Sequence, residues 1–446
     1  MKTIAVLGAG RSASALITYL LQQATAHGWK IVVGDVSEEA ARQRIGGSTR
    51  GEAVSFDINN EENSKQVIKS ADVVISLLPA HFHPIVAQHC LAFNKHLLTA
   101  SYVSKEMEAF DAEAKSKNIL LLNECGLDPG IDHMSAMQVI DKIKLAGGSL
   151  LSFDSFTGGL ISPETDKENP WRYKFTWNPR NVVLAGQGGA AKYVQDGVTK
   201  YIPYHRLFQR PIQVTVPGIG GFDGYANRDS LKYRTHYGID GVPTLKRGTL
   251  RKAGYCAAWD CFVQLGCTDD TFRMELPADA TWRDYIDAFL PYPASRDTRI
   301  NLAYYLGLDP QGPVMAKLDW LGLFSEQQIG VEGLSPAATL QHLLEQKWVL
   351  GPNDKDLVVM WHRFRYSTGG VHQEIHASLA VIGDDQVHTA MARTVGLPIG
   401  IGTKLLLNGK ITDRGVLLPL KPEIYDPILD ELEKLGVVFK EDEIEV

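Results

Sequence analysis

Short apolar runs alternate with helix-like segments along the first 127 residues. The run TIAVL at residues 3–7 is followed by glycines and then by SALITYLLQQATAH, whose apolar residues recur at helical spacing. Four further apolar runs follow along the chain, KIVVGD, VVISLLP, HLLTAS and ILLLNE. Strands that alternate with helices and lack polar positions are typical of a parallel sheet covered on both faces. The pattern predicts an α/β domain of the Rossmann type over residues 1–127.

The character of the chain changes after this domain. Strand-like runs, LLSFDSFTGG, PIQVTVPG and DLVVMWHRFRYS, are joined by long segments rich in Gly, Pro and aromatic residues, which predicts a mixed sheet over residues 128–280 and 351–387. Between residues 281 and 350, amphipathic stretches such as TWRDYIDAFL and SPAATLQHLLEQKW predict a helical insertion. The last segment, from about residue 388 to residue 446, begins with a helix pattern and can pack back on the first domain.

Composition narrows the classes of function. The 446 residues exceed the usual size of one core, and the formal charge of -7 leaves no basic surplus for binding nucleic acid. No run approaches the roughly 18 apolar residues of a membrane span, and the first residues lack the pattern of a secretory signal. Five cysteines without a C-x-x-C pair argue against disulfides and structural zinc. We expect a soluble cytoplasmic protein with no nucleic-acid or membrane partner.

A dinucleotide fingerprint follows the first strand. The segment Gly8, Ala9, Gly10, Arg11, Ser12, Ala13 matches G-x-G-x-x-[GA], and it lies between a predicted strand and a predicted helix. In this pattern the first glycine makes the tight turn, the second lets the pyrophosphate approach the backbone, and the small third residue allows close packing. The context favours cofactor binding over a purely structural turn.

Asp35, at the end of the second strand, bears on the choice of cofactor. A carboxylate at this place can accept hydrogen bonds from the ribose hydroxyls and repels a 2′-phosphate, which favours NAD and leaves NADP as the alternative. Asp35 could instead cap the next helix or be solvated. Arg42 and Arg44 in the next segment could reach a phosphate only if the loop folded inward, and we expect them to be solvated.

The segment SLLPAHFHP, at residues 76–84, leaves a parallel strand at its carboxyl end, where such sheets bind ligands. We expect Leu78 and Pro79 to contact the nicotinamide side of the cofactor. His81 and His83 have no acidic or cysteine partner nearby in the sequence, so we expect surface or packing roles and no metal site.

Several further segments closely resemble saccharopine reductases/dehydrogenases. Two of them, ASYVS at residues 100–104 and NECGLDPGIDH at residues 123–133, each follow a strand of the first domain. The similarity continues almost to the end of the chain through TGGL, YKF, YANRDS, RGTLR and MARTVGLP.

The resemblance implies a fold and a substrate. The expected architecture is a Rossmann domain completed by the C-terminal segment, a mixed α+β substrate and dimerisation domain, and a helical insertion. The expected partner is saccharopine, a secondary amine with three carboxylates, and we expect a homodimer. The resemblance places six residues in the substrate site, namely Ser101, Tyr102, Asp128, Phe175, Arg228 and Thr249.

Each assignment has a structural alternative. Arg228 can grip a carboxylate in two hydrogen bonds or form an ion pair with Asp229 or another acid. Asp128 lies in a Gly-Leu-Asp-Pro-Gly turn, where Asp is common for conformational reasons. Tyr102 could be a packed aromatic whose hydroxyl finds a backbone partner. Family members carry a cysteine at the position of Thr157, so a thiol has no part here, although Thr157 still offers a hydroxyl.

The implied reaction is hydride transfer from the secondary amine to the nicotinamide, followed by hydrolysis of the imine to glutamate and 2-aminoadipate 6-semialdehyde. Tyr102 and Asp128 are the candidate catalytic residues, with Lys174 and His133 as further acid-base candidates. Asp35 favours the NAD-linked, lysine-degrading direction. The rival functions are a carboxynorspermidine or carboxyspermidine dehydrogenase and a non-catalytic Rossmann protein that senses nucleotides.

Overall fold

The computed structural model describes residues 1–291 and 297–445. Residues 292–296 of the predicted helical insertion and residue 446 of the C-terminal segment lie outside the described residues. The chain divides into two compact units. The first unit comprises Met1–Leu150, Tyr366–Gln373 and Leu379–Glu441, and the second unit comprises most of the remaining chain.

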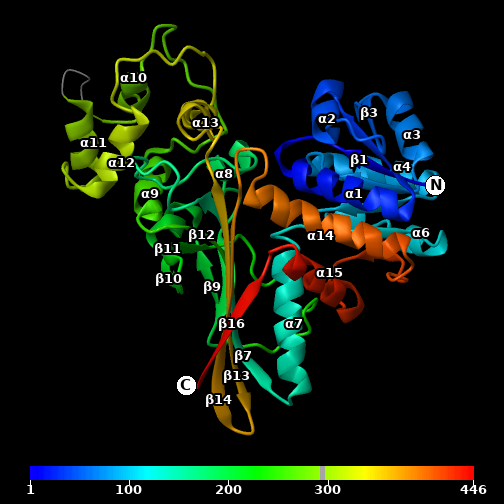
Figure 1. Ribbon diagram of the computed structural model, residues 1–446. Coiled ribbons are helices and arrows are strands. Elements are labelled where there is room, and N and C mark those ends of the chain that lie inside the picture. The colour runs from blue at the N-terminus through cyan, green and yellow to red at the C-terminus, as the bar shows by residue number, and fades with distance from the viewer. Residues whose placement is uncertain (292–296, 446) are drawn as a thin grey trace. The chain divides into compact units, whose positions relative to one another are not determined.

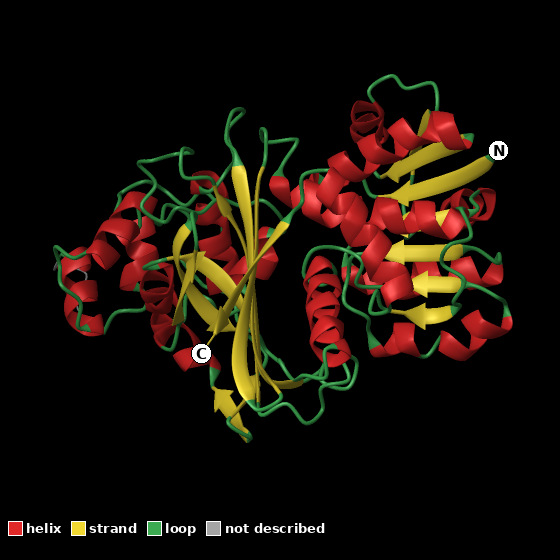
Figure 2. Ribbon diagram, turned by 60° about the horizontal axis from the view of Figure 1, so that its bottom comes forward, coloured by secondary structure: helices red, strands yellow, loops and turns green. Residues whose placement is uncertain are grey.

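A seven-stranded parallel sheet forms the centre of the first unit, with the strand order β15-β6-β5-β4-β1-β2-β3. Helices cover both faces of this sheet (Figure 2). The strands are β1 Lys2–Leu7, β2 Trp29–Asp35, β3 Gly51–Ser55, β4 Val73–Ser76, β5 His96–Thr99, β6 Leu120–Leu122 and β15 Gly415–Leu417. The helices are α1 Ser14–His27, α2 Glu38–Ile45, α3 Glu61–Ser70, α4 His83–Ala92, α5 Lys105–Glu108, α6 Asp111–Ser116, α7 Ile131–Leu145, α14 Ala390–Leu407 and α15 Pro422–Lys434.

The C-terminal segment completes this first unit, as expected. Strand β15 pairs with β6 in parallel, and α14 lies along α1 (Figure 1). Two glycines of α14 permit this close approach, because a Cβ on Gly396 would lie 2.9 Å from the backbone nitrogen of Leu16 and one on Gly400 would lie 2.7 Å from the ring of Tyr19. The predicted Rossmann domain completed by the C-terminal segment is therefore confirmed.

The second unit is built on a mixed sheet with the strand order β10-β11-β12-β7-β13-β14-β16, to which β8 and β9 attach through β12. Strands β12 and β7 run parallel, whereas β10, β11 and β12 are successively antiparallel. The strands are β7 Ser149–Ile161, β8 Ala191–Gln195, β9 Val198–Ile202, β10 Ile212–Val216, β11 Gly220–Ala226, β12 Thr244–Lys252, β13 Asp356–Thr368, β14 Val371–Ile382 and β16 Phe439–Glu445.

Among the described residues of this unit, six α-helices accompany the sheet, namely α8 Pro179–Val183, α9 Tyr255–Leu265, α10 Trp282–Asp287, α11 Thr298–Leu306, α12 Pro313–Leu321 and α13 Pro336–Lys347. The last four form the predicted helical insertion. Large aromatic side chains dominate the core, in which Trp171, Trp259 and Trp348 are fully buried. The mixed α+β part of the predicted fold class is confirmed as well.

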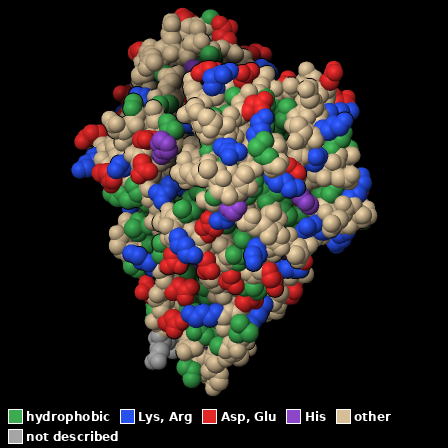
Figure 3. Space-filling model, turned by 45° about the vertical axis from the view of Figure 1, so that its right-hand side comes forward, with side chains coloured by type: hydrophobic (Ala, Val, Ile, Leu, Met, Phe, Trp, Pro, Cys, Tyr) green, Lys and Arg blue, Asp and Glu red, His purple; other side chains and the backbone are tan. Residues whose placement is uncertain are grey.

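No helix among the described residues is long and apolar enough to cross a membrane. Acidic and basic side chains are interspersed on the face of the molecule shown in Figure 3. This face offers no continuous basic surface of the kind that binds nucleic acid.

Candidate functional site

The fingerprint forms the expected strand, turn and helix. Gly8 follows β1 with a positive φ of +106°, and a Cβ there would lie 3.3 Å from the backbone carbonyl carbon of Leu77, so this position requires glycine. Among the described residues, a Cβ on Gly10 would meet no other residue within 4 Å, which leaves room for a ligand. Arg11, Ser12 and Ala13 then form a single helical turn that leads into α1, with Arg11 exposed and Ala13 buried.

Asp35 connects the end of β2 to this loop. Its Oδ2 accepts a hydrogen bond of 2.8 Å from the Ala9 amide, and its Oδ1 accepts one of 3.0 Å from the Ser37 amide. The side chain that caps α2 is that of Ser37, which accepts from the Ala40 amide, so the alternative of Asp35 as the helix cap is wrong. The carboxylate is held beside the fingerprint, where the ribose of a dinucleotide would lie.

Arg44 corrects one expectation from the sequence. Arg42 is exposed and pairs with Glu38, as a solvated helix residue does. Arg44, in contrast, is half-buried, and its Nε donates to the Ala9 carbonyl at 3.3 Å. A cation therefore lies against the fingerprint loop, close to the carboxylate of Asp35.

Leu78 and Pro79 lie two and three residues beyond the end of β4, at the carboxyl edge of the sheet, where the fingerprint also lies. Leu78 is half-buried and packs against the apolar core, whereas Pro79 is exposed. The position agrees with a contact to a bound cofactor, and that contact stays a prediction.

His83 has the packing role that was one of the two expected, and it also contacts three hydroxyl groups. Its ring is buried, with Nδ1 2.9 Å from the Ser76 hydroxyl and Nε2 2.7 Å from the Ser101 hydroxyl and 3.2 Å from the Thr99 hydroxyl. Burial lowers the pKa of His83 to about 4, and the neighbouring His81 adds to this effect. The imidazole is therefore neutral at pH 7, and its contact with the Ser101 hydroxyl holds that hydroxyl in place. His81 is exposed, as expected.

Tyr102 and Asp128 come together at the ends of β5 and β6. The Tyr102 hydroxyl donates to Asp128 Oδ1 at 2.8 Å, while 47% of the Tyr102 side chain is exposed. The alternative of a packed aromatic bonded to the backbone is thus wrong for Tyr102. Asp128 is half-buried, and its carboxylate has a phenol partner in addition to its place in the turn.

The two further acid-base candidates are engaged elsewhere. His133 is fully buried, with Nε2 2.8 Å from Glu124 Oε2. The Lys174 ammonium pairs with Asp354 at 2.7 Å and with Asp166 at 2.9 Å. Burial acts to lower the pKa of Lys174, but these two carboxylates outweigh it and the pKa is raised. Lys174 is therefore a fixed cation at neutral pH.

Three of the predicted substrate residues, Thr157, Thr249 and Arg228, lie in the second unit. The first two are on the neighbouring strands β7 and β12, and Arg228 follows β11. Thr157 of β7 pairs in register with Thr249 of β12, so their side chains share one face of the sheet. The Thr157 hydroxyl is buried and has no hydrogen-bond partner among the described residues, while the Thr249 hydroxyl donates to the Asn227 side chain. Arg228, just beyond β11, is exposed.

The environments of Arg228 and Phe175 differ. The carboxylate of Asp229 pairs with Lys192 at 2.9 Å, which contradicts the alternative of an Arg228 to Asp229 ion pair. Phe175 is buried among Tyr173 and Trp348, with ring centroids 6.0 and 5.4 Å away.

Arg251 is a candidate that the sequence reasoning missed. It is 4% exposed, its Nη1 donates to the adjacent Leu250 carbonyl, its side chain is also hydrogen-bonded to Tyr255, and its Nε has no hydrogen-bond partner among the described residues. The rings of Tyr173, Tyr255 and Tyr225 surround its guanidinium at 4.9, 5.5 and 5.9 Å. No carboxylate lies within ion-pair distance of it in the part of the chain that the structure describes. The signal was its spacing of two from Thr249, which puts both side chains on one face of β12.

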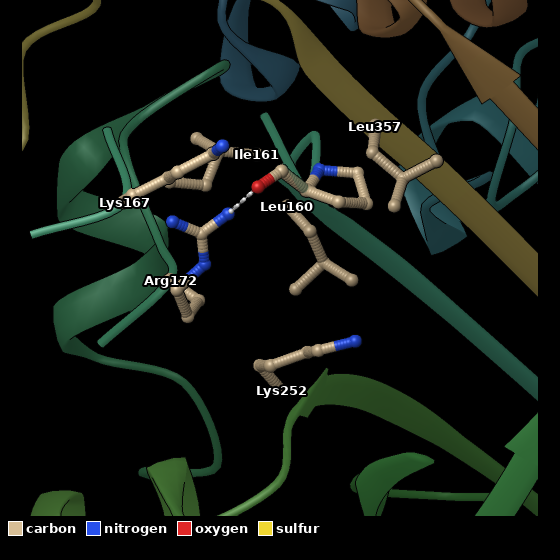
Figure 4. Close-up of a pocket in the computed structure, with 7 residues that line it drawn as sticks. Leu160, Ile161, Lys167, Arg172, Lys252 and Leu357 are labelled. Carbon is tan, nitrogen blue, oxygen red and sulfur yellow. Dashed lines mark hydrogen bonds between the residues drawn. The ribbon is translucent and has the colours of Figure 1, made fainter. Parts of the chain in front are cut away.

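A separate cavity of about 230 Å³ lies in the second unit, at the ends of β7 and β12. Three basic residues, Lys167, Arg172 and Lys252, and the apolar side chains of Leu160, Ile161, Pro163 and Leu357 line it (Figure 4). Arg172 bonds to four backbone carbonyls of residues 162–166 and so orders that loop. None of the predicted substrate residues lines this cavity.

The chain matches two domain models along almost its whole length. Residues 4–122 match the saccharopine dehydrogenase NADP binding domain, and residues 126–437 match the saccharopine dehydrogenase C-terminal domain. The solved structure of the apo, histidine-tagged saccharopine dehydrogenase (L-Glu forming) from Saccharomyces cerevisiae aligns over 100% of both chains with a TM-score of 0.90 at 32% identity.

Two relatives illustrate the range of lengths. The saccharopine dehydrogenase [NADP(+), L-glutamate-forming] of Pyricularia oryzae is 33% identical, over 99% of this chain and 98% of its own. The mitochondrial alpha-aminoadipic semialdehyde synthase of Bos taurus is 34% identical over 98% of this chain, which spans about half of that longer protein, 47%.

Proposed function

Because this chain belongs to the saccharopine dehydrogenase family, we propose that it is a saccharopine dehydrogenase of the glutamate-forming kind. The observation that carries the proposal is the end-to-end likeness to the fungal enzymes of that name, combined with a Tyr102 to Asp128 pair at the edge of the sheet that holds the fingerprint. In the proposed reaction, the carbon on the lysine side of the secondary amine loses a hydride. Water then adds to the imine, which releases glutamate and 2-aminoadipate 6-semialdehyde.

The fingerprint fits a nicotinamide dinucleotide. The positive φ of Gly8, the open space at Gly10 and the Asp35 carboxylate supply the turn, the approach and the ribose acceptor that such a cofactor needs. When bound, the cofactor supplies a hydride acceptor at the nicotinamide. Leu78 and Pro79 would contact its nicotinamide side, and Arg11 and Ser12 would lie beside its pyrophosphate.

Tyr102 and Asp128 would handle protons at the substrate nitrogen and at the hydrolytic water. The amine must lose its proton before hydride departure, and the water must lose one as it attacks the imine. A carboxylate that accepts from a phenol at 2.8 Å can receive either proton, while the phenol stabilises its charge. Ser101, oriented by His83, would hold the substrate next to this pair.

The carboxylates of saccharopine require cations. Arg228 is exposed and has no ion pair among the described residues, and Arg251 is a buried cation without a carboxylate partner. Thr157 and Thr249 offer hydroxyls on the same face as Arg251, and the ring of Phe175 would pack against the carbon chain. Burying an unpaired guanidinium is costly, and an anionic substrate group would offset that cost.

We propose NAD as the preferred cofactor, with NADP as the alternative. Asp35 supports NAD, since its fixed carboxylate would repel a 2′-phosphate. Arg44 at the Ala9 carbonyl would favour a phosphate, and the fungal relatives are named for NADP(+). The balance between these two side chains decides the preference.

The remaining assignments rest on the sequence. The domain limits that we propose are residues 1–127 with 388–446, residues 128–280 with 351–387, and the helical residues 281–350. A homodimer is proposed from the family resemblance, and light scattering would test it. A cytoplasmic location is proposed from the lack of cysteine pairing.

Product analysis tests the proposed function. The secondary amine of saccharopine joins two carbons, and oxidation of the lysine-side carbon yields glutamate. Oxidation of the other carbon would yield lysine and 2-oxoglutarate instead. We expect mass spectrometry to find glutamate and no lysine after incubation with saccharopine and NAD. Lysine as the product would overturn the assignment to the glutamate-forming kind.

A further inference from the structure

We infer that Glu124 and His133 form a buried positioning pair that sets the geometry of Tyr102 and Asp128, an inference that rests on the proposed function. All four residues belong to the first unit. Both members of the pair are fully buried, so the pair acts through the segments that it holds.

Glu124 holds the chain on both sides of Tyr102. Its backbone amide donates to the Ser101 carbonyl at 3.1 Å, and its Oε1 accepts from the Val103 amide at 2.9 Å. One residue thereby fixes the two peptide groups that flank the candidate catalytic tyrosine. The direction of the Tyr102 side chain is set by these two contacts, because they restrain its own backbone dihedrals.

The backbone of Glu124 is in an uncommon conformation. Its φ is +55°, a region that residues other than glycine, asparagine and aspartate rarely adopt. Such strain persists only where the surroundings impose it, and it gathers at functional sites. Here it directs the carboxylate back toward Val103 and His133.

His133 connects Glu124 to the loop that carries Asp128. Its Nε2 lies 2.8 Å from Glu124 Oε2, and its backbone amide donates to the Gly130 carbonyl in the first turn of α7. The adjacent Asp132 accepts from the Gly130 amide at 2.6 Å and so closes the turn that follows Asp128. The Glu124 carboxylate thus joins the segment of Tyr102 to the loop of Asp128.

By restraining the two backbone segments that carry Tyr102 and Asp128, the pair maintains the 2.8 Å contact between their side chains. Candidate proton-transfer groups must be held within a few tenths of an ångström, because a displacement of about 1 Å can cost on the order of 10²-fold in rate. Loss of the pair should lower kcat while the cofactor still binds at the fingerprint.

Two substitutions of His133 separate positioning from bulk packing. His133→Phe keeps a ring of similar size and removes the hydrogen bond to Glu124, and His133→Gln keeps an N–H donor near the place of Nε2. We expect His133→Phe to lower kcat by about tenfold or more, with nucleotide Kd unchanged. We expect His133→Gln to restore kcat toward the wild-type value.

His96 provides the matched control. Its Nδ1 accepts from the Leu120 amide at 2.9 Å, at the opposite end of the strands from Tyr102 and Asp128. His96→Phe removes a comparable imidazole hydrogen bond from the same sheet, and should lower stability without lowering kcat. If His133→Phe does not fold, His133→Asn, whose amide falls short of Glu124, takes its place.

A double-mutant cycle gives the decisive result. In a Tyr102→Phe background, the further substitution His133→Phe should lower kcat by a smaller factor than in the wild-type background, because part of its effect acts through Tyr102. Additive losses, or an unchanged kcat in His133→Phe alone, would overturn the inference while leaving the proposed function intact. A wild-type protein that fails to oxidise saccharopine would instead overturn the proposed function, and this inference with it.

Discussion

The hydroxyl of Tyr102 donates a 2.8 Å hydrogen bond to the carboxylate of Asp128, across two loops that are 26 residues apart in the chain. Each loop follows a parallel strand at its carboxyl end, the edge at which sheets of this kind bind ligands. The two residues that the sequence predicts for acid-base chemistry therefore form a hydrogen-bonded pair.

The first prediction concerns this pair. Asp128→Ala and Tyr102→Phe should each lower kcat by about 10² to 10⁴, the usual range for general acid-base help, and should alter its pH profile. Nucleotide affinity should survive, because neither residue belongs to the fingerprint. Steady-state kinetics across pH 6 to 10 would check this, and wild-type kcat with an unchanged profile in both variants would restrict the two residues to ligand positioning.

The second prediction concerns Arg228. Arg228→Ala should weaken the binding of saccharopine by about 1.5 to 3 kcal/mol, the value of a charged hydrogen bond, and so raise the KM for saccharopine. The KM for the nucleotide should not change. Arg206, another exposed arginine of the second unit, serves as the control, because its Nη1 bonds only the neighbouring Gln209 side chain. If Arg228→Ala and Arg206→Ala have the same small effect, Arg228 holds no substrate carboxylate.

The third prediction concerns cofactor choice. The wild-type protein should have a higher kcat/KM with NAD than with NADP, and Asp35→Ser should shift this ratio toward NADP by about tenfold, or ~1.4 kcal/mol. Asp72 is the matched control, since it also accepts a backbone amide, that of Thr3, but at the far end of β1. Asp72→Ser should leave the ratio unchanged. A wild-type preference for NADP would show that Arg44 outweighs Asp35.

The fourth prediction concerns stability and pH. The pKa of His83 is lowered to about 4 by burial, against 6.5 for an unperturbed histidine. At His83 the unfolded chain therefore binds more protons below pH 6.5, so the contribution of His83 to the free energy of unfolding is constant above that pH and falls as the pH drops from about 6.5 to 4. At pH 5 the contribution of His83 to the loss is about 2 kcal/mol.

Urea denaturation at pH 7.5 and pH 5 would measure this loss. His83→Gln should reduce the difference between the two pH values, whereas substitution of the exposed His81 should change it little. His96 has its pKa lowered to about 4 by burial as well, with Arg414 and Lys2 adding to the effect, and it contributes in the same direction. An equal pH difference in wild type and His83→Gln would contradict the prediction.

Local sequence was enough to predict the parts of the fold that depend on neighbouring residues. The strand, turn and helix around Gly8 and Gly10 follow from the fingerprint, and the central strands are recognisable because nearly every position is buried. The strand β3, Gly51–Ser55, was missed, because it lies at the edge of the sheet and most of its residues are only partly buried.

Residues whose role depends on distant partners were harder to predict. The sequence around His83 does not predict its partners, since the contacts come from Ser76, Thr99 and Ser101, which are distant in the chain from one another or from His83. The sequence next to Thr249 does not single out Arg251, because its lack of a carboxylate partner is visible only in the folded core. The helix that carries Arg44 predicts a solvated side chain, because its partner, the Ala9 carbonyl, is 35 residues away in the chain.

One measurement tests the central claim most directly, a steady-state assay of saccharopine oxidation with NAD and NADP, with carboxynorspermidine as the competing substrate. The account predicts turnover of saccharopine with a kcat/KM well above that for carboxynorspermidine, which lacks the full set of carboxylates that Arg228 and Arg251 would bind. Faster turnover of carboxynorspermidine, or tight nucleotide binding without turnover of either amine, would contradict it.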